Sequence, residues 1–180
     1  MDKLPHVIEQ LRYTPGELKA TLTGTLTEVS QADGNTKRKA LRIGHSDPQN
    51  YILLENAPLQ AWLKDAQMGQ TTTLTGLLSL YRKQHYLWFL PKRQKQPKAI
   101  SLKGRFLTTG NSLVFRNGAD EYLVLENSLR EKVENTKGYP QKEWAVKAML
   151  TDYQGVKYLF LKQEAKSQKT SLQKLLLSGD

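Results

Sequence analysis

The 180-residue chain contains no cysteine. Disulfide bonds, cysteine-based zinc sites and a thiol nucleophile are therefore excluded. The first residues lack the apolar core of a signal peptide, and no apolar run reaches the roughly 18 residues of a membrane-spanning helix. We expect a soluble, cytoplasmic protein with no membrane association.

Acidic residues are missing from one long stretch of the chain. Between Asp65 and Asp120 there is no Asp or Glu, and the chain as a whole has a net charge of +10. The cations in this stretch are Arg82, Lys83, Lys92, Arg93, Lys95, Lys98, Lys103, Arg105 and Arg116. A solvated surface normally mixes both signs, so this distribution favours a polyanionic partner. The alternative explanation is the solubility of a basic protein.

Motifs of the common catalytic classes are also absent. The sequence has no Gly-x-Ser-x-Gly, no P-loop and no Gly-x-Gly-x-x-Gly. Its three histidines, His6, His45 and His85, lie far apart and lack the paired spacing of metal ligands. We therefore expect a protein that is not an enzyme and has no catalytic residues, metal site or cofactor.

The chain repeats itself. Residues 51–56 read Tyr-Ile-Leu-Leu-Glu-Asn and residues 122–127 read Tyr-Leu-Val-Leu-Glu-Asn, while residues 74–90 align without a gap on residues 146–162. Matched pairs are Gly24 and Gly104, Tyr81 and Tyr153, Tyr86 and Tyr158, and Trp88 and Phe160. A repeat of this length indicates one structural unit present twice.

Both units show the same order of predicted elements. Alternating apolar residues predict strands, and apolar residues at helical spacing after Asn56 predict a helix whose buried face holds Leu59, Trp62, Leu63 and Ala66. Strands are expected at 20–29, 38–43, 51–55, 71–81 and 85–90. The second unit has them at 100–109, 112–117, 121–126, 143–153 and 156–162, with a helix near 129–135.

Three strands, a helix and two strands in roughly 70–80 residues resemble the oligonucleotide/oligosaccharide-binding (OB) fold, a five-stranded Greek-key barrel. The resemblance implies an all-β protein with short helices and two tandem OB-like barrels, each β-β-β-α-β-β. Gly24 and Gly104 suit the sharply coiled first strand of such a barrel. The expected segments are an N-terminal helical segment 1–17, domain 1 at 18–91, a basic linker 92–98, domain 2 at 99–163, and a tail 164–180 with a short amphipathic helix.

The resemblance also implies a ligand surface on the second and third strands, flanked by the loops after strands one and four. In the first unit both loops are basic, and the later one mixes rings with charge. Cations neutralise phosphates and aromatic rings stack on bases. The candidate nucleic-acid-binding residues are Lys37, Arg38, Lys39, Arg42, Tyr51, Tyr81, Arg82, Lys83, His85, Tyr86, Lys92, Arg93 and Lys95.

The direction of individual side chains follows from strand alternation. If Ile52 and Leu54 face the core, Tyr51 faces outward beside Arg42. Packing between neighbouring strands is the alternative role for Tyr51. Trp88 and Phe89 lie on opposite faces of one strand, so at most one of them is free to stack on a base.

The second unit has less basic loops, which indicates a weaker ligand site or a docking role. The favoured hypothesis is a non-enzymatic protein that binds single-stranded DNA or RNA on domain 1 and the linker. The alternative is a protein-interaction or assembly factor that docks through its barrels, with a protein partner bound by domain 2 or the C-terminal helix.

Overall fold

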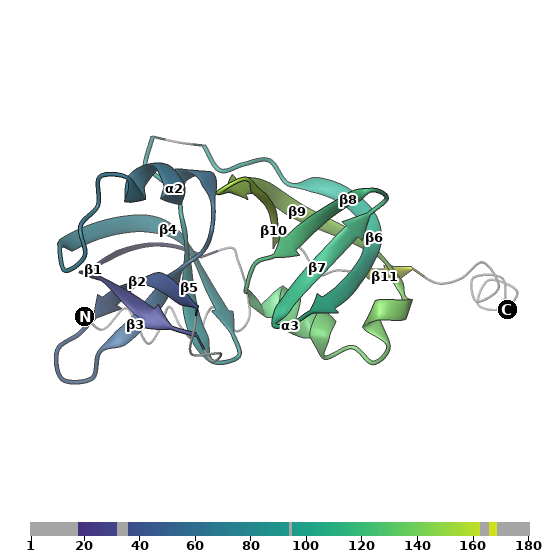
Figure 1. Ribbon diagram of the computed structural model, residues 1–180, viewed down its shortest axis with the longest axis horizontal. Coiled ribbons are helices and arrows are strands. Elements are labelled where there is room, and N and C mark those ends of the chain that lie inside the picture. Colours follow the sequence, from purple (N-terminus) through teal and green to yellow (C-terminus); the bar gives the residue numbers. More distant parts are fainter. Residues whose placement is uncertain (1–17, 32–35, 94, 163–165, 169–180) are drawn as a thin grey trace, which may run out of the picture.

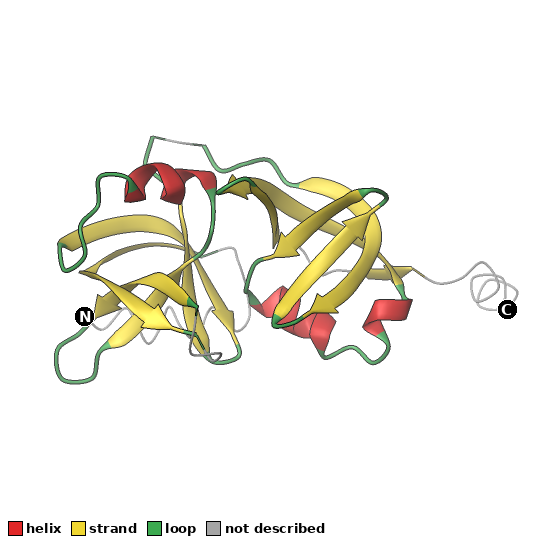
Figure 2. Ribbon diagram, in the orientation of Figure 1, coloured by secondary structure: helices red, strands yellow, loops and turns green. Residues whose placement is uncertain are grey.

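The computed structural model describes residues 18–31, 36–93, 95–162 and 166–168, and these residues form two β-barrels side by side (Figure 1). Strands dominate both, and each barrel carries one short α-helix (Figure 2). The predicted N-terminal helix and the amphipathic helix of the tail lie outside the described residues. In the described part of the chain, no helix has the length and apolar character needed to span a membrane.

Barrel 1 is closed by five strands in the order β1-β2-β3-β5-β4. The strands are β1 (Lys19–Ser30), β2 (Lys37–Ile43), β3 (Gln49–Leu53), β4 (Thr71–Tyr81) and β5 (Gln84–Phe89). Helix α2 (Ala57–Leu63) lies between β3 and β4 in sequence. Its apolar face packs on the barrel core through Leu59, Trp62, Leu63 and the following Ala66, as predicted.

Barrel 2 repeats this arrangement. Its strands are β6 (Ile100–Thr109), β7 (Ser112–Asn117), β8 (Asp120–Val124), β9 (Glu143–Tyr153) and β10 (Val156–Leu161). The sheet order is β10-β8-β7-β6-β9, and a further β10–β9 pairing closes the ring. Helix α3 (Ser128–Glu134) and a 3-10 turn (Tyr139–Gln141) connect β8 to β9. Strand β11 (Lys166–Gln168), which the sequence pattern did not predict, pairs with the start of β9.

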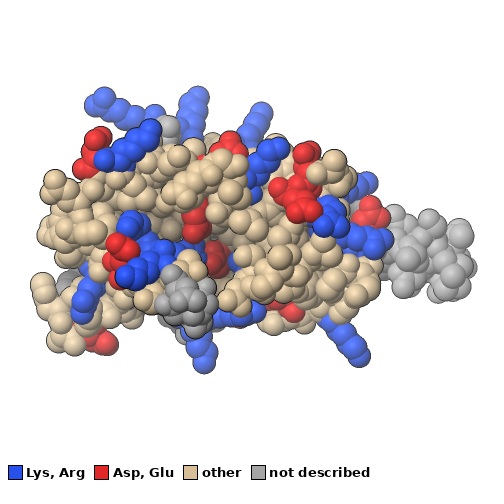
Figure 3. All heavy atoms as spheres, viewed as in Figure 1, with Lys and Arg blue, Asp and Glu red and all other residues tan. Residues whose placement is uncertain are grey.

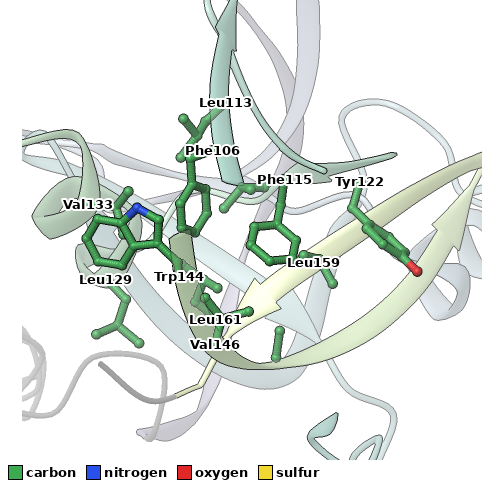
Figure 4. Packing of buried hydrophobic residues seen from close by; sticks show 12 residues of the cluster. Phe106, Leu113, Phe115, Tyr122, Leu129, Val133, Trp144, Val146, Leu159 and Leu161 are labelled. Carbon is green, nitrogen blue, oxygen red and sulfur yellow. The ribbon is translucent and has the colours of Figure 1, made fainter. Parts of the chain in front are cut away.

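The expected fold class, two tandem five-stranded OB-like barrels, is therefore confirmed. Each barrel has its own core, and in barrel 2 the rings of Phe106, Phe115 and Trp144 meet at its centre (Figure 4). Phe106 lies 5.0 Å from Phe115 and 5.5 Å from Trp144, measured between ring centroids. Aromatic contacts at these distances add stability beyond the apolar area that they bury.

The asparagine that ends each repeated hexad joins the helix to the barrel. Asn56 accepts a hydrogen bond from the backbone N–H of Leu59 (2.8 Å) and donates one to the carbonyl of Phe89 (3.0 Å). Asn127 makes the equivalent bonds to Arg130 N–H (2.9 Å) and the Leu161 carbonyl (2.9 Å). Both side chains are fully buried, so the predicted N-cap has a second role as a clamp on the last strand.

The two barrels share a third apolar cluster. It contains Ile52, Leu54 and Trp88 from barrel 1 and Leu125, Met149 and Phe160 from barrel 2. The rings of Trp88 and Phe160, which are matched positions in the repeat, lie 5.0 Å apart. The later parts of β3 and β5 are buried on both faces, and this matches their apolar runs from Tyr51 to Leu53 and from Tyr86 to Phe89.

Matched polar contacts flank this shared cluster. In the turn after β4, the backbone N–H of Arg82 donates to Glu131 on α3 (2.7 Å). In the turn after β9, the N–H of Gln154 donates to Gln60 on α2 (2.9 Å). Arg82 and Gln154 are equivalent in the repeat, as are Gln60 and Glu131. The barrels therefore pack around an approximate two-fold axis, like the two subunits of a symmetric dimer.

Candidate nucleic-acid interface

A cleft of about 1010 Å³ lies between the two barrels, and we call it the inter-barrel cleft. Barrel 1 contributes β2 and the turn after β4, and barrel 2 contributes the β6–β7 turn, β8 and α3. Figure 3 shows a hollow between the two halves of the molecule, with acidic and basic atoms inside it. Five cations and three carboxylates line the cleft, so its walls carry a net positive charge.

A buried ion cluster forms one part of the floor. Arg38 donates to Glu55 at 2.8 Å and also donates to Glu126. The two glutamates are equivalent members of the repeated hexads, and one guanidinium holds both. Burial alone would lower the pKa of Arg38, but the carboxylates of Glu126 and Glu55 reverse that effect and raise it. Arg38 is therefore a structural cation that links the barrels.

Within this cluster, burial disfavours the charged form of the Glu55 carboxyl. Burial raises the pKa of its carboxyl, Arg38 acts in the opposite direction, and Glu126 adds to the increase. One arginine thus faces two carboxylates, and the net result for Glu55 is a pKa above its ordinary value.

A second cluster connects the turn after β4 to α3. The hydroxyl of Tyr81 donates to Glu134, and Arg130 reaches the same carboxylate at 3.2 Å. The guanidinium of Arg130 also lies 4.7 Å from the centre of the Tyr81 ring. Arg82 lies 3.4 Å from Glu134, but 66% of its side chain remains exposed. Arg82 is therefore available to a ligand, whereas Tyr81 is not.

Three further rings of barrel 2 line the cleft and are only half buried: Tyr139, Tyr153 and Tyr158. Tyr153 and Tyr158 meet edge to face at 6.5 Å between centroids. Burial, with the nearby Glu55 carboxylate, raises the pKa of Tyr158 to about 12. Burial also raises the pKa of Tyr153, so both of these phenols stay neutral near pH 7.

The tyrosine rings that were predicted to stack on bases in barrel 1 are buried. Tyr51 is 1% exposed and belongs to the core of barrel 1, where it stacks on His85 at 5.1 Å. Tyr81 and Tyr86 are each 6% exposed, in the contact with barrel 2. Of the two roles considered for Tyr51, the outward one is wrong and the packing one is correct, because Ile52 faces barrel 2 and Tyr51 faces the core of barrel 1.

The two neighbouring aromatic residues at the end of β5 are also buried. Trp88 belongs to the shared cluster and Phe89 to the core of barrel 1, so both are buried. Neither ring is free to stack on a base. Barrel 2 covers the outer face of β5, which the sequence of one barrel alone does not reveal.

The other predicted residues have mixed positions. Lys37 is exposed and lines the cleft, whereas the Lys39 ammonium group is paired with Glu28 at 3.1 Å. Arg42 and Lys83 are exposed outside the cleft lining. The linker residues Lys92, Arg93 and Lys95 are exposed as well. The cleft thus brings together Lys37, Arg38, Lys39, Tyr81, Arg82 and Tyr86 but not the remaining candidates.

Glu55 of barrel 1 was not predicted as a cleft residue, and six further charged or aromatic cleft residues that were not predicted belong to barrel 2. They are Glu126, Arg130, Glu134, Tyr139, Tyr153 and Tyr158. A signal for some of them was present, because Glu126, Tyr153 and Tyr158 recur at the positions of Glu55, Tyr81 and Tyr86. Within the described residues, no three His, Asp or Glu side chains gather to hold a metal ion.

No protein-family model matches the chain, and no curated protein matches its sequence. Among solved structures, the chain is similar to the wild-type single-stranded DNA-binding protein from Thermus aquaticus at 14% identity and a TM-score of 0.30. That match covers 85% of this chain and 93% of the other. A deletion mutant of the same protein gives 14% identity, a TM-score of 0.29, and coverage of 85% and 83%. Similarity at this level does not indicate a function for this chain.

Proposed function

We propose that this protein binds single-stranded nucleic acid in the inter-barrel cleft and catalyses no reaction. The observation that carries the proposal is the lining of the cleft: exposed cations lie on its walls together with three half-buried tyrosines. Cations that follow a phosphate backbone, combined with rings that offer stacking faces, are what a single strand requires.

The carboxylates in the cleft do not oppose this assignment. Glu55 and Glu126 are held by Arg38, and Glu134 is held by Arg130 and Arg82. Lys37 forms no ion pair within the described residues and is exposed. With the acids already engaged, Lys37 and the exposed part of Arg82 present the positive charge that a phosphate would meet.

The half-buried rings favour a single strand over a duplex. The faces of bases in a duplex are covered by their neighbours, whereas an unpaired base can stack on Tyr139, Tyr153 or Tyr158. Stacking on such rings is worth roughly 1–3 kcal/mol per base and tolerates any sequence. We therefore propose binding with little sequence preference, to DNA or RNA.

A paired substitution tests the site. Lys37→Gln with Arg82→Gln removes two cations from the cleft, and Lys19→Gln with Lys64→Gln removes two exposed cations that do not line it. We expect the cleft variant to bind a labelled oligonucleotide with a salt dependence less steep by about 1.4, from roughly 0.7 per phosphate. The control variant should keep the wild-type slope.

The two variants have the same net charge, so a general charge effect would change both equally. Equal slopes in the cleft and control variants would contradict the proposed site. Thermal unfolding of each variant checks the fold, and only small changes are expected because exposed ion pairs contribute about 0–1 kcal/mol.

A further inference from the structure

Four exposed cations lie on the outer face of barrel 2, outside the inter-barrel cleft. They are Lys103 and Arg105 on β6, Arg116 on β7 and Lys147 on β9, and we call them the basic strip. Each points away from the core, because core residues flank it in sequence: Phe106 follows Arg105, Phe115 precedes Arg116, and Lys147 lies between Val146 and Ala148.

The cations are neighbours in the sheet. Arg105 and Arg116 are directly opposite each other, Lys103 lies two residues along the same strand from Arg105, and Lys147 faces Ser101 two residues further on. Neighbouring strands are about 4.8 Å apart, and residues two apart on a strand are separated by about 6.7 Å. The strip therefore forms one continuous band of charge across three strands.

This band is poorly neutralised within the protein. Arg116 bonds to Glu121 at 2.7 Å, but Lys103, Arg105 and Lys147 form no ion pair within the described residues. Like charges directly opposite one another in a sheet are destabilising. An external anion that bound here would relieve that repulsion.

Barrel 1 shows that the fold does not need three of these cations, whereas its residue at the position of Arg116 is also an arginine, Arg42. Because Gly24 matches Gly104, Thr23 and Thr25 occupy the positions of Lys103 and Arg105, and Thr75 occupies that of Lys147. The barrel 1 threonines satisfy each other: Thr23 bonds to Thr73 at 2.8 Å and Thr21 bonds to Thr75 at 2.9 Å. The same strand positions thus fold well without charge, and these three cations of barrel 2 call for another explanation.

The strip starts near the edge of the cleft, on the opposite face of β6, so a ligand reaches it by crossing the β6–β7 turn. Thr108 on β6 and Ser112 on β7 line the cleft, and Arg105 lies three residues from Thr108, about 10 Å along the strand. Beyond Arg105 the path reaches Lys103 and then Lys147. A strand leaving the cleft over the β6–β7 turn would therefore pass directly onto the strip.

We infer that the basic strip is a second contact for the phosphates of the strand that occupies the cleft. This inference rests on the proposed function and extends it: the cleft stacks bases and the strip holds backbone. Among the residues that the structure describes, no exposed ring lies beside the basic strip, so the contact is electrostatic and independent of sequence. An acidic protein surface is the alternative ligand of the strip. Its binding would not require the strip to lie close to the cleft.

The internal repeat supplies the test. The strip variant carries the barrel 1 residues, Lys103→Thr, Arg105→Thr and Lys147→Thr, and leaves Arg116 with its partner Glu121. The relocated variant adds Thr23→Lys, Thr25→Arg and Thr75→Lys, which returns the same charges to the matched face of barrel 1. Both are titrated against the wild type with unstructured oligonucleotides of about 8 and about 30 nucleotides, since an OB fold covers roughly 4–16, and with polyglutamate.

We expect the strip variant to bind the short oligonucleotide as the wild type does. Its salt slope for the long one should be less steep by about 2, from three phosphate contacts. The relocated variant should behave like the strip variant, because position and not net charge matters. Recovery of long-oligonucleotide binding in the relocated variant would overturn the inference, and so would an unchanged strip variant.

Two other results separate this inference from the proposed function. A strip variant that binds both oligonucleotides normally but loses polyglutamate binding would assign the strip to an acidic protein and leave the cleft proposal intact. Failure of the wild type to bind either oligonucleotide would overturn the proposed function and, with it, the assignment of the strip to nucleic acid.

Discussion

Arg38 shows how one side chain can resemble a ligand contact and act as a structural link. It lies on the strand where an OB fold would hold a ligand, yet its side chain is only 10% exposed and holds Glu55 and Glu126. Removing one partner of a buried ion pair costs about 3–5 kcal/mol, because the remaining charges are left uncompensated. An alanine at this position would weaken binding through misfolding, so it does not test the binding site.

The pH dependence of stability tests whether the pKa of Glu55 stays raised although Arg38 lies beside it. Folding raises the pKa of Glu55 above 4.5, mainly through burial. A carboxyl with a raised pKa contributes its stability below the unfolded value and loses it as the pH rises through the folded value. Glutamine does not titrate, so we expect Glu55→Gln to become more stable relative to the wild type as the pH rises from about 4 to neutral.

Urea unfolding at several pH values measures this difference. Glu143→Gln, which removes an exposed carboxyl that forms no ion pair in the described residues, is the matched control. A stability difference between wild type and Glu55→Gln that stays constant with pH would contradict the raised pKa of Glu55 in the folded protein.

At the scale of elements, the first strand of each barrel depends on a glycine for close packing. A Cβ on Gly104 would overlap the carbonyl oxygen of Arg116 and lie 2.9 Å from the Phe115 ring. We expect Gly104→Ala to destabilise the protein by roughly 1–3 kcal/mol, the usual cost of overpacking. Ser101→Ala on the same strand is the control, and thermal unfolding the measurement. Equal stability of the two variants would show that β6 can move away from β7 freely.

The elements could be predicted from the sequence more completely than the directions of their side chains. Alternation in β1 and β6, the helix face around Leu59 and the repeated Asn caps all specify local structure. The run from Tyr51 to Leu54 has no polar residue to mark a solvent face, so strand parity was ambiguous there. The prediction also treated each barrel alone, although apolar residues on both faces of β3 and β5 indicate that another layer covers them.

At the scale of the whole molecule, the repeat explains the candidate site. Matched positions meet across the approximate two-fold axis: Trp88 with Phe160, and Glu55 with Glu126 around Arg38. The sequence repeat made these pairs visible, but their contact depends on how the barrels dock. The cleft is a product of that docking, and for this reason its barrel 2 residues escaped prediction.

The central claim is that the cleft binds a single strand through both charge and stacking. The most direct test is a titration of the wild type and Tyr153→Leu with single-stranded and duplex oligonucleotides between about 50 and 200 mM salt. With about two phosphate contacts in the cleft and about three on the basic strip, we expect a slope near −3.5 for a long oligonucleotide and roughly a hundredfold loss of affinity over that range. The wild type should prefer the single strand. Tyr153→Leu should keep the slope but lose a salt-independent part of the affinity, roughly 1–3 kcal/mol. Equal affinity for duplex and single strand, with no effect of Tyr153→Leu at any salt concentration, would contradict the claim.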